Sequence, residues 1–222
     1  SHLLNNPTDM SIRKATSTDE GDRLAIVNTG DGSMAVYTLL RDQNIVAASK
    51  FTTDGIFLNI ATVVSDQYAA VKRSINSANK YYIELFDESL TLDSALTGGG
   101  AANVSSGHLN TKAVKVIGDG VMQADVTAGS SSIVFASTTA ASFEVGLNYD
   151  ITVKTLPIEP GIQGYASLKG FKKRVLEVNA FLNETQNITI SGNTIPIKTL
   201  GSDNLDVGVP EFTGTKTLHG IL

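Results

Sequence analysis

The stretch KRSINSANKYYIELFDESLTLDSALTGGG, residues 72–100, carries the pattern that decides the fold class. Its side chains alternate up to a small polar turn at NSAN (76–79) and alternate again over YYIELFDE (81–88). An acidic segment and three glycines follow. A period of two residues, interrupted by Asn and Ser, is typical of antiparallel strands joined by a tight turn. The stretch therefore predicts a β-hairpin.

Upstream of this hairpin the same alternation recurs at short intervals. We expect strands in MSIRKAT (10–16), RLAIVNT (23–29), MAVYTLLR (34–41), IVAASKFT (45–52), IFLNIATVV (56–64) and YAAVKRSI (68–75). Four strands within about 45 residues is the spacing of β-propeller blades. Because a propeller needs at least four blades, residues 1–97 are expected to be the C-terminal part of a larger propeller.

Downstream, small uncharged residues at 98–107 predict a flexible linker. Longer alternating runs follow in AVKVIGDGVMQADV (113–126), FEVGLNYDITVK (143–154), KRVLEVNAFL (173–182) and NITISGNTIPIKTL (187–200). In the third of these runs Leu176, Val178, Ala180 and Leu182 are expected to face inward, and the fourth is expected to form a hairpin over SGN (191–193). On 143–153 the odd, apolar positions are expected to be buried and the even ones exposed. The sequence thus predicts a second domain over 108–222, a β-sandwich or barrel that is truncated at its C-terminal end. The fold class is all-β and antiparallel.

Composition excludes several kinds of chemistry. The chain has 222 residues and no cysteine, which rules out disulfides, thiolate metal sites and Cys nucleophiles. Its formal net charge of −5 argues against tight nucleic-acid binding. No apolar run is long enough to form a membrane-spanning helix, so no membrane insertion is expected.

Catalytic residues are sparse. The three histidines, His2, His108 and His219, are scattered along the chain. The turns at Asp31-Gly32 and Asp119-Gly120 lack the spacing of calcium loops, so they are interpreted as tight turns. We therefore predict no enzyme activity, no metal and no cofactor.

Two charged groups leave alternatives open. A pair of carboxylates among Glu84, Asp87, Glu88 and Asp93 would suit a glycosidase, whereas a solvated or structural acidic edge is the interpretation favoured here. The basic cluster Lys172, Lys173 and Arg174 is either a contact for phosphate or an acidic neighbour, or the solvated end of a strand.

Several motifs together resemble the tail nozzle family of short-tailed bacteriophages, also called tail tubular protein B or phage stabilisation proteins. They are the Thr-x-Gly-x-Phe at 53–57, VKRSIN (71–76), YYIELF (81–86), Asp93-Ser94, SGHLNTKAVKVIGDGVMQ (106–123), FEVGLNYDITVKTLPIE (143–159) and GFKKRVLEVNAFLNET (170–185). The family-like positions are Lys72, Arg73, Tyr82, Glu84, Asp93, Asp119, Gly120, Gly146, Tyr149 and Pro157.

The resemblance implies a structural virion protein that forms part of the conduit for genome ejection. It further implies a ring of identical subunits, six in the full-length protein, which contacts portal, adaptor and fibre proteins of the tail. DNA would pass through without specific binding, and the protein would occupy the virion tail after assembly in the host cytoplasm. A receptor- or carbohydrate-binding tail-tip module and a polysaccharide-degrading tailspike are the alternatives.

Overall fold

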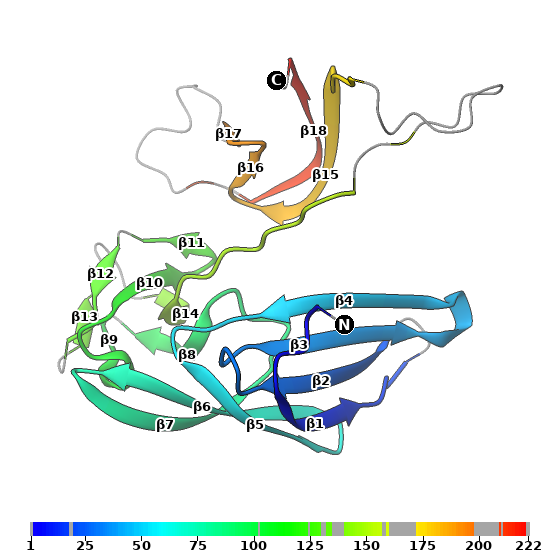
Figure 1. The fold of residues 1–222 in the computed structure, drawn as a ribbon. Helices are drawn as coiled ribbons and strands as arrows, with labels where there is room; N and C mark the ends of the chain where they lie inside the picture. Colours follow the sequence, from blue (N-terminus) through cyan, green and yellow to red (C-terminus); the bar gives the residue numbers. More distant parts are fainter. Residues whose placement is uncertain are drawn as a thin grey trace, which may run out of the picture. The chain divides into compact units, whose positions relative to one another are not determined.

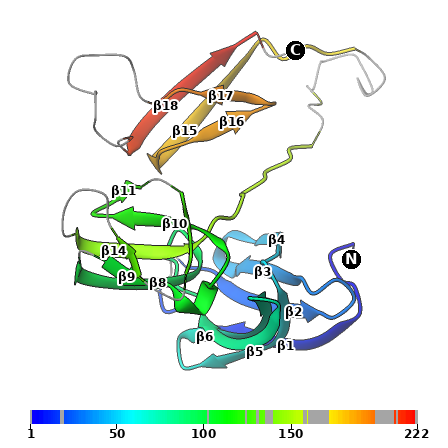
Figure 2. The same ribbon diagram turned by 90° about the vertical axis from the view of Figure 1, so that its left-hand side faces the viewer.

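The fold is taken from a computed structural model (Figures 1 and 2). It describes residues 2–17, 20–101, 103–123, 125–129, 132–134, 140–156, 159, 172–197, 209 and 211–220. Across them the regular structure consists of β-strands and two 3-10 turns. All strand pairings among these residues are antiparallel, and none of the described sheets closes on itself. The predicted all-β, antiparallel class is confirmed.

The chain divides into two compact units, Ser1–Tyr149 and Asp150–Leu222. The first unit begins with a four-stranded sheet in chain order. Its strands are β1 (Pro7–Arg13), β2 (Asp22–Asn28), β3 (Met34–Leu40) and β4 (Ile45–Phe51), with a 3-10 turn η1 (Arg41–Gln43) before β4. Between β2 and β3, Asp31 accepts hydrogen bonds from the N–H and hydroxyl of Ser33, and Gly32 has a φ of +68°. The predicted tight turn at Asp31-Gly32 is confirmed.

A second sheet of three strands follows, β5 (Ile56–Val63), β6 (Asp66–Ile75) and β7 (Ala78–Leu85). Strands β6 and β7 form the predicted hairpin, because Ile75 pairs with Ala78 across the two residues Asn76 and Ser77. Both of these residues have positive φ, 49° and 62°. A two-residue turn with positive φ at both positions matches the twist of the flanking strands.

The two sheets enclose a hydrophobic core built from β2, β3, β5 and β6. Its buried members are Ala25, Val27, Met34, Val36, Phe57, Ile60, Ala69 and Val71. Alternation along β6 explains how the strand contributes to this core, since Gln67, Ala69, Val71, Arg73 and Ile75 all lie buried on one face. Fully burying a large apolar side chain stabilises a fold by about 1.5–3 kcal/mol.

A third sheet completes the first unit. It contains β8 (Asp93–Ala101), β10 (Ala113–Gly118), β11 (Val121–Met122), β12 (Val126–Thr127) and β14 (Ala140–Leu147). Strands β9 (Asn103–Ser105) and β13 (Ser132–Val134) pair separately, and η2 (Gly107–Leu109) is a 3-10 turn. The hydrophobic core beside the third sheet consists of Ile75, Leu109, Val114, Val116, Ala128, Ala140, Val145 and Leu147. Strand β6 therefore supplies residues to both cores of this unit.

The glycine-rich segment differs from the predicted linker. Gly98 and Gly99 belong to β8 and pair with Phe143 and Ser142 of β14. A Cβ atom on Gly98 would lie 2.6 Å from the ring of Phe143. These glycines thus allow a close approach between strands rather than flexibility, and the boundary between the compact units falls after Tyr149.

The expected long strand over 143–153 is only partly correct. Val145 and Leu147 are buried as predicted, and Phe143 is half-buried. Strand β14 ends at Leu147, and Tyr149, Ile151 and Val153 are exposed. Alternation alone does not predict where β14 ends, because a strand also needs a hydrogen-bonding partner. The pairing with β8 ends at Leu147, which lies opposite Asp93.

The second unit contains two described two-stranded sheets. One pairs β15 (Glu177–Thr185) with β18 (Phe212–His219), and the other pairs β16 (Ile188–Ile190) with β17 (Asn193–Ile195). The predicted hairpin over Ser191-Gly192 is confirmed, and both turn residues have positive φ. Val178, Ala180 and Leu182 are half-buried in alternation, whereas Leu176, which precedes the strand, is exposed. The expected inward position of Leu176 is therefore wrong.

Candidate functional site

Two networks centred on arginines stand out in the first unit. The first surrounds Arg73, which lies on the inner face of β6 between Val71 and Ile75. Val71 belongs to one hydrophobic core and Ile75 to the other. The side chain of Arg73 is 0% exposed. The strand thus places a cation at the junction of two apolar cores, where it must be paired.

Two carboxylates from neighbouring strands pair with this cation. Arg73 donates from Nε and Nη2 to the two oxygens of Glu84 on β7, at 2.9 and 2.7 Å. It also donates from Nη1 and Nη2 to Asp93 at the start of β8, at 3.3 and 3.1 Å. A fifth bond runs from Nη1 to the carbonyl of Asp54. The bidentate contact with Glu84 is the geometry that a guanidinium and a carboxylate favour.

Further polar groups fix the carboxylates. Thr53 donates its hydroxyl to Asp93 (2.6 Å), and Ser94 donates its hydroxyl to Glu84 (3.0 Å). The ring Nε2 of His108 lies 3.0 Å from the carbonyl of Ser94, and Tyr82 donates to the carbonyl of His108 (2.7 Å). The network therefore connects β6, β7, β8 and η2.

The electrostatics of Arg73 indicate a structural role. Burial by itself lowers the pKa of its guanidinium. The hydrogen bond to Glu84 and the charge of Asp93 outweigh burial, and the pKa is raised. Because the side chain is fully enclosed, Arg73 cannot reach a ligand without opening the fold. We interpret this first network as an internal joint between strands.

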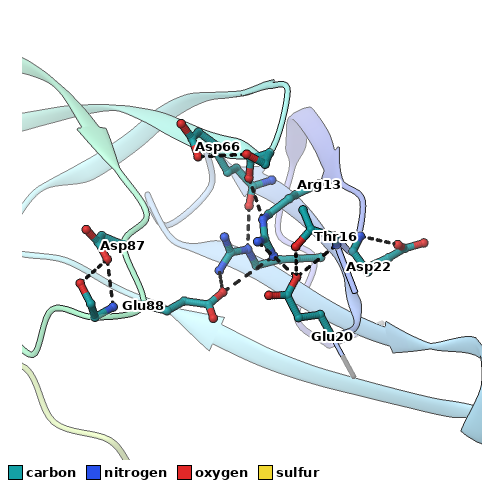
Figure 3. A network of polar contacts seen from close by, with 12 residues as sticks. Arg13, Thr16, Glu20, Asp22, Asp66, Asp87 and Glu88 are labelled. Carbon is teal, nitrogen blue, oxygen red and sulfur yellow. Dashed lines mark hydrogen bonds and ion pairs between the residues drawn. The ribbon is translucent and has the colours of Figure 1, made fainter. Parts of the chain in front are cut away.

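The second network lines an open hollow on the first unit (Figure 3). Arg13 ends β1, and its direct partner across the antiparallel ladder is Arg23 on β2. Like charges placed directly opposite one another on a sheet destabilise it. The two guanidiniums therefore require anionic neighbours.

Fixed groups hold the inner nitrogens of both arginines. Arg13 donates from Nε to the carbonyl of Ser65 (2.7 Å), and Arg23 donates from Nε to the side chain of Gln67 (3.0 Å), which is buried. The guanidinium of Arg23 also lies over the ring of Phe86, 5.5 Å from its centroid. Such a contact with an aromatic face orients a cation. The outer nitrogens are thereby presented to the hollow.

Two glutamates supply the negative charge. Glu20 accepts from Arg13 Nη2 at 3.4 Å and from the backbone N–H and hydroxyl of Thr16 at 3.2 and 2.9 Å. These Thr16 bonds, and then the charge of Arg13, lower the pKa of Glu20. Glu88, on the loop after β7, places Oε1 3.0 Å from Arg23 Nη1 and 4.0 Å from Arg13 Nη1. Burial, the largest influence, lowers the pKa of Arg23 despite the charge of Glu88.

The structure brings several of the family-like positions together. Arg73, Tyr82, Glu84 and Asp93 share the first network. Gly146 on β14 is buried beside them, since a Cβ there would lie 2.7 Å from the carbonyl oxygen of Asp93.

The other predicted positions lie apart from this network. Lys72 is half-buried, and Asp119 and Gly120 form the predicted turn between β10 and β11. Tyr149 is exposed, and Pro157 lies outside the described residues. The cluster Lys172, Lys173 and Arg174 is exposed and precedes β15 in the second unit.

The four carboxylates considered for a glycosidase all have neighbours in the fold. Glu84 and Asp93 hold Arg73, Asp87 accepts from Ser89, and Glu88 pairs with Arg23. Among the described residues, no group of three or more His, Asp or Glu side chains could hold a metal ion.

Sequence reasoning missed Arg13, Arg23 and Phe86. The contacts among these three residues depend on the β1–β2 register and on a loop about 65 residues away, so local sequence patterns carried no signal beyond the charges themselves.

The chain matches no protein-family model, and no curated protein matches it in sequence. Within the described part of the chain, no helix is long and apolar enough to cross a bilayer.

Proposed function

We propose that this chain is a structural subunit of a phage tail nozzle, assembled with copies of itself around the path of the ejected genome. Its four- and three-stranded sheets would be blades of a larger propeller, followed by a β-sandwich or barrel. The support is the ordered resemblance of its motifs to that family, together with the edges of the first two sheets.

The observation that carries the proposal is the outer face of β7. This strand lies at the edge of its sheet, and its apolar side chains Tyr81 (68% exposed), Ile83 (81%) and Leu85 (47%) face outward. The alternate residues, Tyr82 and Glu84, face inward to the Arg73 network. An exposed apolar edge strand is a template for pairing with another chain.

A second edge has the same character. Strand β4 lies at the edge of the four-stranded sheet (Figure 1), and all of its residues are exposed, with Val46 at 69%. Two apolar edges on one subunit suit a closed ring, in which each subunit contacts two neighbours through different surfaces. The internal ionic joint at Arg73 would keep the spacing of these edges fixed.

Sedimentation equilibrium of the wild-type protein and of Ile83→Lys tests the proposal. We expect the wild type to self-associate and Ile83→Lys to lose at least about tenfold in association constant, because the change places a charge in an apolar contact. Val64→Lys is the matched control, since Val64 is 95% exposed but lies in the β5–β6 turn. Equal association of all three proteins, or a wild type that stays monomeric at every concentration, would contradict the assembly proposal.

Two assays separate the alternatives. A tail-tip module would bind defined glycans on an array, and a tailspike would depolymerise host polysaccharide. Neither activity is expected of a nozzle subunit.

A further inference from the structure

The hollow beside Arg13 and Arg23 has an arrangement that fold stability alone does not explain. Two like charges face each other across neighbouring strands, and each side chain is only 15% exposed. Such a pair is costly unless an anion lies between the two groups. Both Nε atoms are bound to fixed protein groups, and Arg13 Nη2 is bound to Glu20, so the Nη1 atom of each arginine is the one directed to that position.

The group that fills this position is weakly held. Glu88 places a single oxygen within reach of both arginines, yet its side chain is 69% exposed. Glu84, in the first network, is only 20% exposed and binds its arginine through both oxygens. An exposed ion pair contributes little to stability. Glu88 can therefore exchange with another carboxylate at little cost.

The surroundings select the kind of anion that could replace Glu88. The hollow has a volume of about 280 Å³, and its lining contains the carboxylates of Asp66, Asp87 and Glu88 beside the two arginines. This acidic lining would repel a polyanion such as a nucleic-acid backbone. A single carboxylate that takes the place of Glu88 leaves the charge between the arginines unchanged.

We infer that Arg13 and Arg23 form an exchangeable carboxylate-binding site, which Glu88 fills as an internal ligand. The incoming group is either a small carboxylate or an acidic side chain of a second copy of this chain. In both cases it takes the position of the Glu88 carboxylate, and Glu88 moves into solvent. This inference does not depend on the proposed role in the phage tail.

The test is a titration of the Glu88→Gln protein with sodium acetate, followed by NMR of the arginine Nε–H resonances. Sodium chloride at equal ionic strength is the reference. Because the variant lacks the internal carboxylate, we expect a saturable shift of the Arg23 resonance with an affinity at least about tenfold tighter than in the wild type. Asp42→Asn is the matched control, since it removes an exposed charge that does not line this hollow and should behave as the wild type.

The outcomes are distinct. An acetate response in Glu88→Gln no stronger than in wild type, or no stronger than the response to chloride, overturns the inference. The double variant Glu88→Gln/Arg23→Gln should lose the acetate-induced shift of the arginine resonances. If the Arg13 resonance of this double variant still shifts with unchanged acetate affinity, the inference is also overturned. A failed acetate response leaves the nozzle proposal unaffected, and equal association of the wild type and Ile83→Lys leaves the carboxylate site unaffected, so the two tests fail independently.

Sedimentation of the same samples identifies the source of the carboxylate. If acetate binds and also dissociates the assembled protein, an acidic side chain of a second copy occupies the site. If acetate binds without a change in sedimentation, the ligand is a small carboxylate. Both results support the carboxylate site.

Discussion

The Arg73 network and the Arg13–Arg23 hollow use the same chemistry in opposite ways. Each pairs arginine with carboxylates contributed by segments outside its own strand. In the first, the cation is fully enclosed and its partners Glu84 and Asp93 are largely shielded from water. In the second, the main partner of Arg23 is the exposed Glu88.

The difference shows that burial of the carboxylate, rather than the ion pair itself, separates a structural joint from an exchangeable site. A buried charge that loses its partner cannot regain hydration, so removal of one member is strongly destabilising. An exposed partner returns to water, so its loss costs little.

The largest effect is expected from removing each arginine in turn. Arg73→Met should lower the free energy of unfolding by about 3–5 kcal/mol, because Glu84 and Asp93 would remain close together without a cation. Arg23→Met should cost about 1–2 kcal/mol, mainly because the buried Gln67 loses a donor. Urea denaturation measures both values. Equal losses would show that the two networks do not differ as described.

A smaller effect is expected from the carboxylates. Glu84→Gln should cost about 2 kcal/mol, since the bidentate contact with Arg73 loses its charge while Asp93 remains. Glu88→Gln should cost less than about 1 kcal/mol. The same denaturation measurement applies. A larger loss in Glu88→Gln than in Glu84→Gln would reverse the assignment of joint and exchangeable site.

Much of the fold could be predicted from alternation and turns, and the reason is local. The hairpin at Asn76-Ser77 and the turns at Asp31-Gly32 and Asp119-Gly120 depend on residues a few positions apart. The pairing of Gly98 in β8 was not predicted, because it depends on Phe143, which is distant in sequence.

The same limit applies to the sites. The sequence singled out Arg73, Glu84 and Asp93 one by one, but their meeting requires the pairing of β6 with β7 and the start of β8. Glu84 was expected to belong to a solvated or structural acidic edge. Its bidentate contact with Arg73 agrees with the structural form of that interpretation. The sequence of β7 alone does not predict that Ile83 faces solvent, because this depends on which face of the strand the hydrophobic cores cover.

A separate ion pair joins Lys50 on β4 to Asp31 in the turn between β2 and β3, and its stability depends on pH. The hydrogen bond from Lys50, followed by those from Ser33, lowers the pKa of Asp31 to about 2. Because the folded pKa lies below the ordinary value of 3.8, the stabilisation is present above that value and is lost as the pH falls toward about 2.

Lys50→Met should therefore raise the pKa of Asp31, as measured by carbon NMR of the carboxyl group. Asp87 is the internal control, because Ser89 rather than a lysine lowers its pKa. An unchanged pKa of Asp31 would show that Lys50 does not hold it.

The smallest effect is expected at the exposed basic cluster. Changing Lys172, Lys173 and Arg174 to Ala should leave duplex DNA binding weak and unchanged at about 150 mM salt, because a chain with a net charge of −5 is expected to let DNA pass. Fluorescence anisotropy with a labelled duplex measures this. A wild-type dissociation constant below about 10⁻⁶ M that is lost in the triple variant would contradict passive passage.

Hydrogen exchange at low and high protein concentration tests most directly whether the apolar edge strands are surfaces for self-association. We expect slower exchange in the peptides that cover β4 (Ile45–Phe51) and β7 (Ala78–Leu85) at high concentration, and unchanged exchange in β6 (Asp66–Ile75). Unchanged exchange in β4 and β7 under conditions in which the protein assembles would contradict this expectation.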